Sequence, residues 1–171
     1  MKLQEILESE NVIEEIDSNM EYLLTIIPEI KNMIGFPHNH PHHHLDVWEH
    51  TKLALSLSEN DFEIRLALLL HDIGKPFSYQ DEEIRHFHGH AEKSSEMAKV
   101  ILKRLNFQDE FINKISKLIE LHDTEITKED IEKYYDFTLK RYEIQRCDAL
   151  AHHPEKLDKR KDYLEKIKKM L

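Results

Sequence analysis

The stretch Leu66-Ala67-Leu68-Leu69-Leu70-His71-Asp72-Ile73-Gly74-Lys75-Pro76 places an imidazole and a carboxylate side by side where an apolar run stops. The run predicts a buried helix, which we expect Gly74 to cap and Pro76 to terminate. An unpaired buried carboxylate is costly, and the C-terminal end of a helix favours a nearby cation. The pair therefore suits a divalent metal. The alternative is a helix-capping Asp72 beside a stacked His71.

Helical periodicity dominates the remaining sequence, and no strand signal competes with it. Three Gly and five Pro among 171 residues disfavour an all-β sandwich. We predict one all-α domain, residues 1–171, of about seven to nine helices. Its core covers about 40–153, with an N-terminal helical extension 1–34 and a C-terminal helix 154–171. Helices are expected near 3–7, 23–34, 46–55, 61–72, 89–105, 108–122, 127–135 and 136–152, with a His-rich loop at 35–44 and a polar loop at 75–86.

Composition and charge restrict the class of protein. The net charge of −10 opposes binding of long nucleic acids, but a small phosphorylated ligand remains possible because a metal inverts the local field. The single cysteine, Cys147, excludes an internal disulfide, and no run approaches the roughly 20 apolar residues of a membrane span. We expect a soluble, cytoplasmic protein. Residues 155–171 carry seven Lys or Arg against four acids, which indicates a solvated face or a docking surface.

Histidine is concentrated near candidate helix ends, with 13 residues in the chain. Asp148 interrupts an apolar helical stretch, where it lacks a structural reason unless it faces a partner. His50 lies on a helix near a buried side. Together with His71 and Asp72, these residues would form a site of nitrogen and oxygen ligands from three helices. Such a site suits Mn, Fe, Co, Ni or Zn better than Ca or Mg alone.

A second metal is suggested by two further histidines. His90 lies where one helix opens, and His122 lies where another closes. If both converge on Asp72, this carboxylate could bridge two ions about 3.5–4 Å apart, which can activate a water and clamp a phosphoryl oxygen. Alternatively, one metal is bound, and His90 and His122 contact the substrate phosphate. The sequence leaves both arrangements open.

The other histidines invite a blander interpretation. We expect the loop residues to face solvent with only adventitious metal affinity, although His43 or His44 could line the site. His152 follows Asp148 by one helical turn and could face the site, whereas His153 is not expected to. The full set of loop histidines is His38, His40, His42, His43 and His44.

Several motifs together resemble the HD-domain phosphohydrolase superfamily, whose signature is a His, a His-Asp pair and a later Asp. The matching stretches are residues 43–51, 69–76, 86–90 and 146–151. The likeness is greatest to the HD domain of bacterial tRNA nucleotidyltransferases and poly(A) polymerase-like proteins. Residues 1–40 offer neither the Gly-rich turn nor the paired aspartates of nucleotide transfer, so we do not expect polymerase activity.

The resemblance implies a helical fold and metal-dependent hydrolysis of phosphomonoesters or phosphodiesters. It implies that Lys75 contacts phosphate and that the metal ligands are His50, His71, Asp72 and Asp148, with His90 and His122 as the extra histidines of a metal-rich branch.

We therefore expect a stand-alone phosphohydrolase that acts on a nucleotide or another small phosphate ester through a metal-bound hydroxide. Asp72 and Lys75 would be catalytic. Lys75, His88 and Arg85 would bind the substrate, although Lys75 and Arg85 are alternatively ordinary solvated residues. The cofactor would be one or two divalent transition-metal ions, with Mg possible. The alternative function is a non-catalytic metal- or nucleotide-binding module that acts as a sensor or scaffold.

Overall fold

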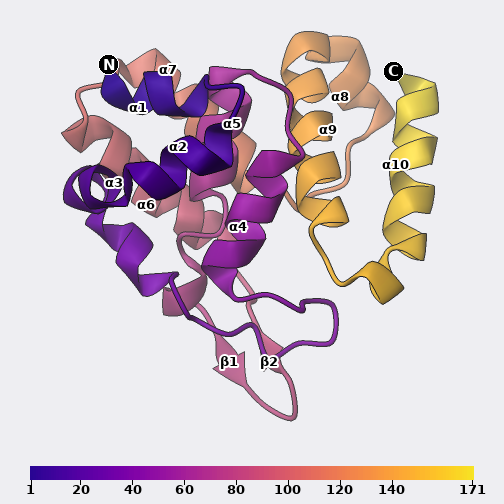
Figure 1. The fold of residues 1–171 in the computed structure, drawn as a ribbon. Coiled ribbons are helices and arrows are strands. Elements are labelled where there is room, and N and C mark those ends of the chain that lie inside the picture. The colour runs from indigo at the N-terminus through magenta and orange to yellow at the C-terminus, as the bar shows by residue number, and fades with distance from the viewer.

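The computed structural model describes residues 1–171 and is all-α except for one small hairpin (Figure 1). It has ten α-helices rather than seven to nine, because residues 12–18 form a helix of their own. The α-helices are α1 Lys2–Leu7, α2 Val12–Ser18, α3 Met20–Ile26, α4 Val47–Ser56, α5 Phe62–Leu70, α6 His90–Arg104, α7 Asp109–Glu120, α8 Lys128–Lys133, α9 Tyr135–Leu150 and α10 Asp158–Met170. Three 3-10 helices are η1 Pro28–Asn32, η2 Lys75–Phe77 and η3 Pro154–Lys156.

Side-chain caps set the start of three helices. The Asp46 carboxylate accepts a hydrogen bond from the Glu49 amide at the start of α4, and Asp61 caps α5 in the same way. At α8, which begins close to the expected start at residue 127, Thr127 and Asp130 form a reciprocal capping box. These local contacts satisfy amide groups that a helix leaves without partners in its first turn.

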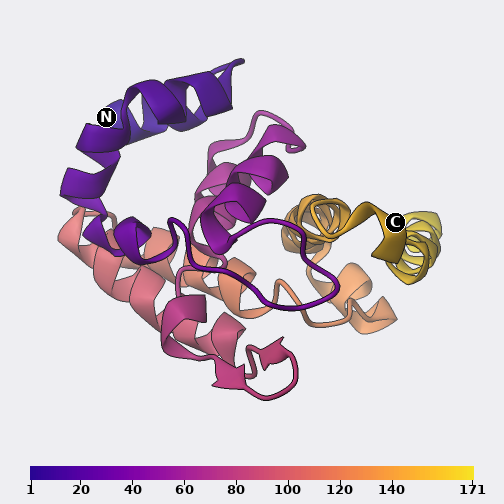
Figure 2. The same ribbon diagram turned by 60° about the horizontal axis from the view of Figure 1, so that its bottom comes forward.

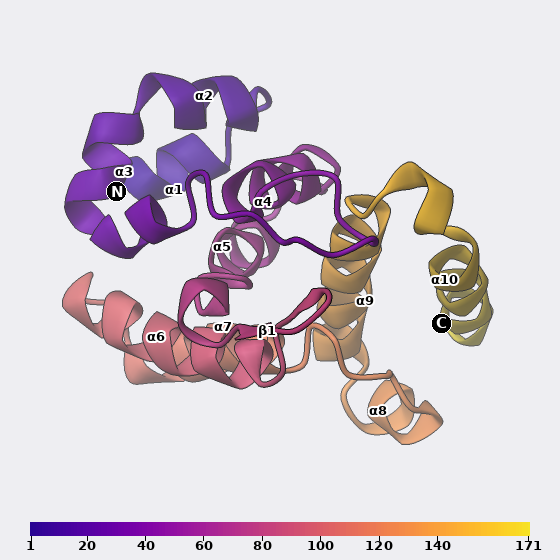
Figure 3. The same ribbon diagram turned by 90° about the horizontal axis from the view of Figure 1, so that it is seen from below.

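Helix α5 lies at the centre of the fold, and every residue from Ile64 to Leu70 is buried. It packs against α1, α4, α6, α7 and α9. Helices α6 and α7 lie side by side beneath it, while α1–α3 and α10 lie on opposite sides of the molecule (Figures 2 and 3). The N-terminal helices share one hydrophobic cluster with the central helices, because Leu3, Ile16 and Ile30 belong to it. Cys147 is buried in the same cluster.

Gly74 does not cap α5, contrary to our expectation, because His71 is the residue at the C-cap position. The helix ends at Leu70, and Gly74 has an ordinary right-handed φ of −84°. A glycine is needed here because a side chain would not fit: an added Cβ would lie 2.6 Å from the Ser94 nitrogen of α6. The Gly74 amide donates a 2.8 Å hydrogen bond to Ser94 Oγ. Gly74 thus brings the end of α5 against α6.

The predicted polar loop at 75–86 contains η2 and a two-stranded hairpin. Strands β1 Gln80–Asp81 and β2 Arg85–His86 pair antiparallel. The Arg85 amide donates to Asn39 O at 2.9 Å, which ties the hairpin to the loop before α4. These two segments lie together at the lower end of the molecule in Figure 1. None of the helices has the length and hydrophobicity that a membrane span requires.

Candidate metal centre

Four side chains from α4, the end of α5 and α9 meet at one point. Asp148 Oδ1 lies 2.8 Å from His50 Nε2 and 3.1 Å from His71 Nε2. Asp72 Oδ2 lies 3.2 Å from His71 Nε2 and 3.6 Å from His50 Nε2. One ligand atom from each of the four lies within 4.8 Å of the others, close enough to surround one cation.

A second group forms on the other oxygen of the same carboxylate. Asp72 Oδ1 lies 3.4 Å from His90 Nε2 and 3.7 Å from His122 Nε2. His90 begins α6 and His122 follows the end of α7, so the packed α6–α7 pair brings them together. Asp72 therefore belongs to both groups through different oxygens, the arrangement that a bridging carboxylate requires.

Backbone carbonyls orient all four histidines of the two groups. His71 Nδ1 lies 2.6 Å from Leu68 O, and His50, His90 and His122 make equivalent contacts to carbonyl oxygens at 3.1, 2.9 and 2.7 Å. A carbonyl only accepts, so each Nδ1 carries the proton and each Nε2 faces the centre. Such contacts fix the ring orientation and tautomer of histidines that bind metals.

The donor atoms fit a cation. Both Asp72 oxygens are buried without a well-formed hydrogen bond, although charged groups lie nearby. His90 Nε2 and His122 Nε2 are 3.1 Å apart. If both rings are neutral, their lone pairs oppose each other unless a cation or proton lies between them. Nitrogen and carboxylate donors without partners are the atoms that a divalent transition metal binds.

The electrostatics of the first group favour a positive charge there. Burial opposes charge on His71, but the Asp72 and Asp148 carboxylates outweigh it and raise its pKa to about 10. Burial would likewise raise the pKa of Asp72, but neighbouring His71 and Lys75 hold it well below its usual range. In the second group, burial lowers the pKa of His90 to about 4 despite Asp72. The centre thus combines anionic carboxylates with at least one neutral imidazole.

Lys75 is buried and belongs to the site, so its alternative reading as a solvated loop lysine is wrong. Its Nζ lies 3.1 Å from Asp72 Oδ2 and 3.0 Å from His38 Nε2. His38 Nδ1 donates to Leu45 O at 2.8 Å, so its Nε2 accepts from Lys75. The His38 ring stacks on His43 at 3.7 Å. His38 therefore orients Lys75, a role that the sequence did not reveal.

Replacing His38 by Ala is expected to lower the free energy of unfolding by about 1–3 kcal/mol, because Lys75 loses a buried hydrogen-bond acceptor. Urea denaturation measures this change. His44→Ala is the matched control, since the exposed His44 belongs to the same loop and its loss should stay within about 0.5 kcal/mol. Equal effects of the two variants would contradict the assignment of His38.

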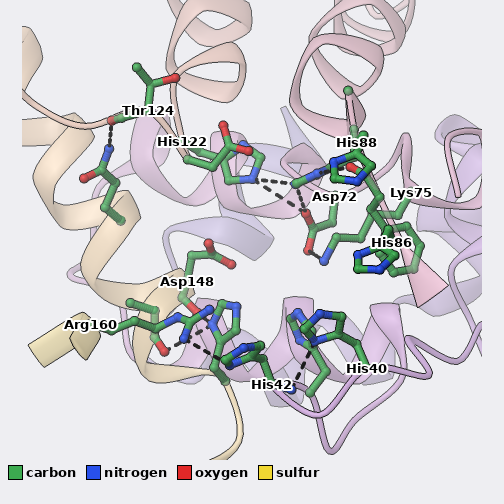
Figure 4. Close-up of a pocket in the computed structure, with 18 of the residues that line it drawn as sticks. His40, His42, Asp72, Lys75, His86, His88, His122, Thr124, Asp148 and Arg160 are labelled. Atoms are coloured by element: carbon green, nitrogen blue, oxygen red, sulfur yellow. Dashed lines mark hydrogen bonds and ion pairs between the residues drawn. The ribbon is translucent and has the colours of Figure 1, made fainter. Parts of the chain in front are cut away.

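Residues of both groups line a pocket of about 650 Å³ (Figure 4). The fully buried His50 and His71 do not line it. Among the pocket residues are Asp72, Lys75, His90, His122 and Asp148. Sequence reasoning did not assign pocket positions to several others, namely His40, His42, His86, Gln145, Lys159, Arg160 and Tyr163.

The loop histidines do not behave as one group. The expectation that all five face solvent is wrong for His38, which is buried, and His43 lines the pocket. His44 does not line it. At the end of α9, His152 lines the pocket and His153 does not, as expected. The burial of His38 depends on contacts with Leu45, Lys75 and His43, which no local pattern reveals.

Arg85 and His88 also line the pocket. The Arg85 guanidinium donates to Asp81 at 2.6 and 3.2 Å and to Pro37 O at 3.1 Å, so it fastens the hairpin to the neighbouring loop. His88 is exposed and stacks on His86. Substrate binding by Arg85 and His88 stays a prediction.

Comparison with known proteins identifies the family. The family model described as HD domain matches residues 42–168. The chain therefore belongs to the HD domain family, which places it in a superfamily of metal-dependent phosphohydrolases. This confirms the resemblance seen in the sequence motifs, and the His and Asp groups are where a metal could bind.

The curated proteins to which the chain is similar include two tRNA nucleotidyltransferases. The CC-adding tRNA nucleotidyltransferase of Thermus thermophilus is 33% identical over 132 residues, covering 72% of this chain and 29% of that protein. The A-adding tRNA nucleotidyltransferase of Deinococcus radiodurans is 32% identical over 112 residues, covering 61% of this chain and 26% of that protein. The multifunctional CCA protein of Shewanella denitrificans is 34% identical over 93 residues, which cover 52% of this chain and 22% of that protein. The chain thus spans less than a third of each relative.

Proposed function

We propose that this protein hydrolyses the phosphate ester of a nucleotide or another small phosphorylated compound in a metal-dependent reaction. The observation that carries the proposal is Asp72. Its two oxygens face two separate groups of metal-ligand side chains, and Lys75 lies 3.1 Å from one of them. Asp72 thus lies between two groups of potential metal ligands, next to the Lys75 ammonium group, and lines the pocket. This arrangement suits the binding and hydrolysis of a phosphate ester.

The chain's own residues would bind and orient the substrate. A divalent ion held by His50, His71, Asp72 and Asp148 would polarise a phosphoryl oxygen and acidify a bound water. Lys75 has three N–H groups, of which Asp72 and His38 engage two. The third remains for a non-bridging phosphate oxygen, where it would stabilise developing negative charge.

The size and charge of the pocket favour a small substrate. Its volume of about 650 Å³ lies within the range of roughly 300–1,000 Å³ that is typical of small-molecule sites. The net charge of −10 opposes long nucleic acids. Two of the three relatives are named as tRNA nucleotidyltransferases, which supports a phosphorylated nucleotide as the first substrate class to test. Histidine ligands favour Mn, Fe, Co, Ni or Zn over Mg as the cofactor.

An activity panel tests the proposal. Protein stripped with a chelator and reloaded with Mn²⁺ or Ni²⁺ would be assayed on mononucleotides, 2′,3′-cyclic nucleotides and dinucleoside polyphosphates. We expect hydrolysis of at least one class, lost on chelation and restored by metal. Stoichiometric metal binding without turnover on any compound would instead support a non-catalytic sensor or scaffold.

We also propose that two ions bind, one in each group. Replacing His122 by Ala should then reduce the metal content of the protein from two ions to one, because the second group loses a ligand. Elemental analysis of purified, metal-equilibrated protein measures this. His44→Ala should retain both ions. A single ion in both the wild type and His122→Ala would favour the other arrangement, with His90 and His122 contacting the substrate phosphate.

A further inference from the structure

Arg160 has an unusual lack of partners in this protein. Four of the six arginines form ion pairs with carboxylates, namely Arg85, Arg104, Arg141 and Arg146. Arg65 has no carboxylate but donates to several oxygen atoms, including Leu7 O and Ser9 O. Arg160 has neither arrangement.

The contacts of Arg160 involve only one nitrogen of its guanidinium. Nη1 lies 3.2 Å from Lys156 O and 3.5 Å from His42 Nδ1. A guanidinium has five N–H donors, so Nε and Nη2 remain without protein acceptors. Neither is a buried atom lacking a hydrogen bond, so both reach solvent. These two nitrogens form a fork that matches two oxygens of a phosphate.

The position of Arg160 separates it from the first cation. It lines the pocket from α10, beside His42 and Asp148, whereas Lys75 lies across the pocket beside Asp72 (Figure 4). In Figure 4, Asp72 and Asp148 lie between Lys75 and Arg160. Lys159, the preceding residue, lines the same pocket. Both basic residues come from the segment 155–171, whose excess of positive charge has no role in the proposed hydrolysis.

We propose that Arg160, assisted by Lys159, binds a second anionic group of the substrate. The inference rests on the proposed function and narrows its substrate class to nucleosides that carry two phosphates on different oxygens. One phosphate would lie at the metal centre beside Lys75, and the other would meet the free fork of Arg160. Arg160 would thus determine the preference for substrates with two phosphates. A phosphate bound there would form an ion pair with a partly buried guanidinium that has no carboxylate partner in the protein.

The test compares one phosphate with two. Manganese-loaded protein is assayed on adenosine 5′-monophosphate, adenosine 3′-monophosphate and adenosine 3′,5′-bisphosphate. The KM of the wild-type protein should be roughly 10- to 100-fold lower for the bisphosphate than for either monophosphate, which is the range expected for charge-assisted hydrogen bonds. Arg160→Gln should lose this preference through KM rather than kcat. Lys166→Gln, an exposed change on the same helix that lies outside the pocket, should keep it.

Each remaining outcome decides the proposal. If Arg160→Gln raises KM for all three compounds by the same factor, Arg160 binds the same phosphate as Lys75. The proposed second subsite is then wrong, even though hydrolysis occurs. If none of the three compounds is hydrolysed, the wider activity panel decides the proposed function, and calorimetric titration of the same three compounds decides the subsite separately. Tighter binding of the bisphosphate, lost in Arg160→Gln, would support it, and equal affinities would overturn it.

Discussion

Replacing Asp72 by Asn is expected to remove bound metal and to lower phosphate-ester hydrolysis roughly a thousandfold or more. Asp72 is the one residue that both ligand groups share, and an amide is a much weaker ligand than a carboxylate. A catalytic metal contributes several kcal/mol to transition-state stabilisation, and each 1.36 kcal/mol or so is a factor of ten in rate. A near-isosteric Asn should leave the helical fold in place.

Three measurements on the same preparation check this result: metal content by elemental analysis, hydrolysis rate and helical circular dichroism. A further readout is the rise in melting temperature on adding metal, which should vanish with binding. Asp162→Asn is the matched control, because Asp162 is exposed on α10 and forms no ion pair. Normal metal content in Asp72→Asn would contradict the proposed centre.

Replacing Gly74 by Ala is expected to destabilise the protein by about 3 kcal/mol. The new methyl group would lie 2.6 Å from the Ser94 nitrogen and 2.9 Å from the Lys93 carbonyl carbon, and both belong to backbone. Backbone cannot rotate away as a flexible side chain can, so α6 must move. Forcing an extra carbon into packed structure costs about 1–3 kcal/mol, occasionally more, and the hydrogen bond from the Gly74 amide to Ser94 would be strained as well.

Urea denaturation measures the loss, and Gly35→Ala provides the comparison. Gly35 has a positive φ of 74° but open space around its Cβ position, so its substitution tests backbone strain alone. That strain costs about 1–2 kcal/mol. If Gly74→Ala costs no more than Gly35→Ala, the close approach of α5 and α6 is less rigid than the structure indicates.

The packing of Gly74 against α6 also affects the geometry of the candidate metal centre. It lies two residues after Asp72, and the helix it contacts begins at His90. Fixing the end of α5 against α6 therefore sets the position of Asp72 relative to His90. A displacement at Gly74 should accordingly weaken the second ligand group along with overall stability.

Much of the architecture could be predicted because it depends on nearby residues. The apolar run before His71 produced the buried α5, and Asp61 and Thr127 cap helices close to their expected starts. Residues 12–18 were missed as a helix, and the cap assigned to Gly74 was wrong. The rule that glycine often caps a helix depends on neighbouring residues only. Gly74 is instead needed because α6, which is distant in the sequence, packs against it too closely for a Cβ atom.

The sequence by itself determined the helical class, the family and the types of residue available to hold a metal, since periodicity, capping and motifs are local properties of the chain. Only the tertiary structure decided which groups meet. The contact of His50 with Asp148 spans 98 positions, and that of His90 with His122 spans 32. The burial of His38 beside Lys75 and the two unpaired guanidinium nitrogens of Arg160 likewise arise from helix packing, because a side chain's partners depend on elements far away in the chain.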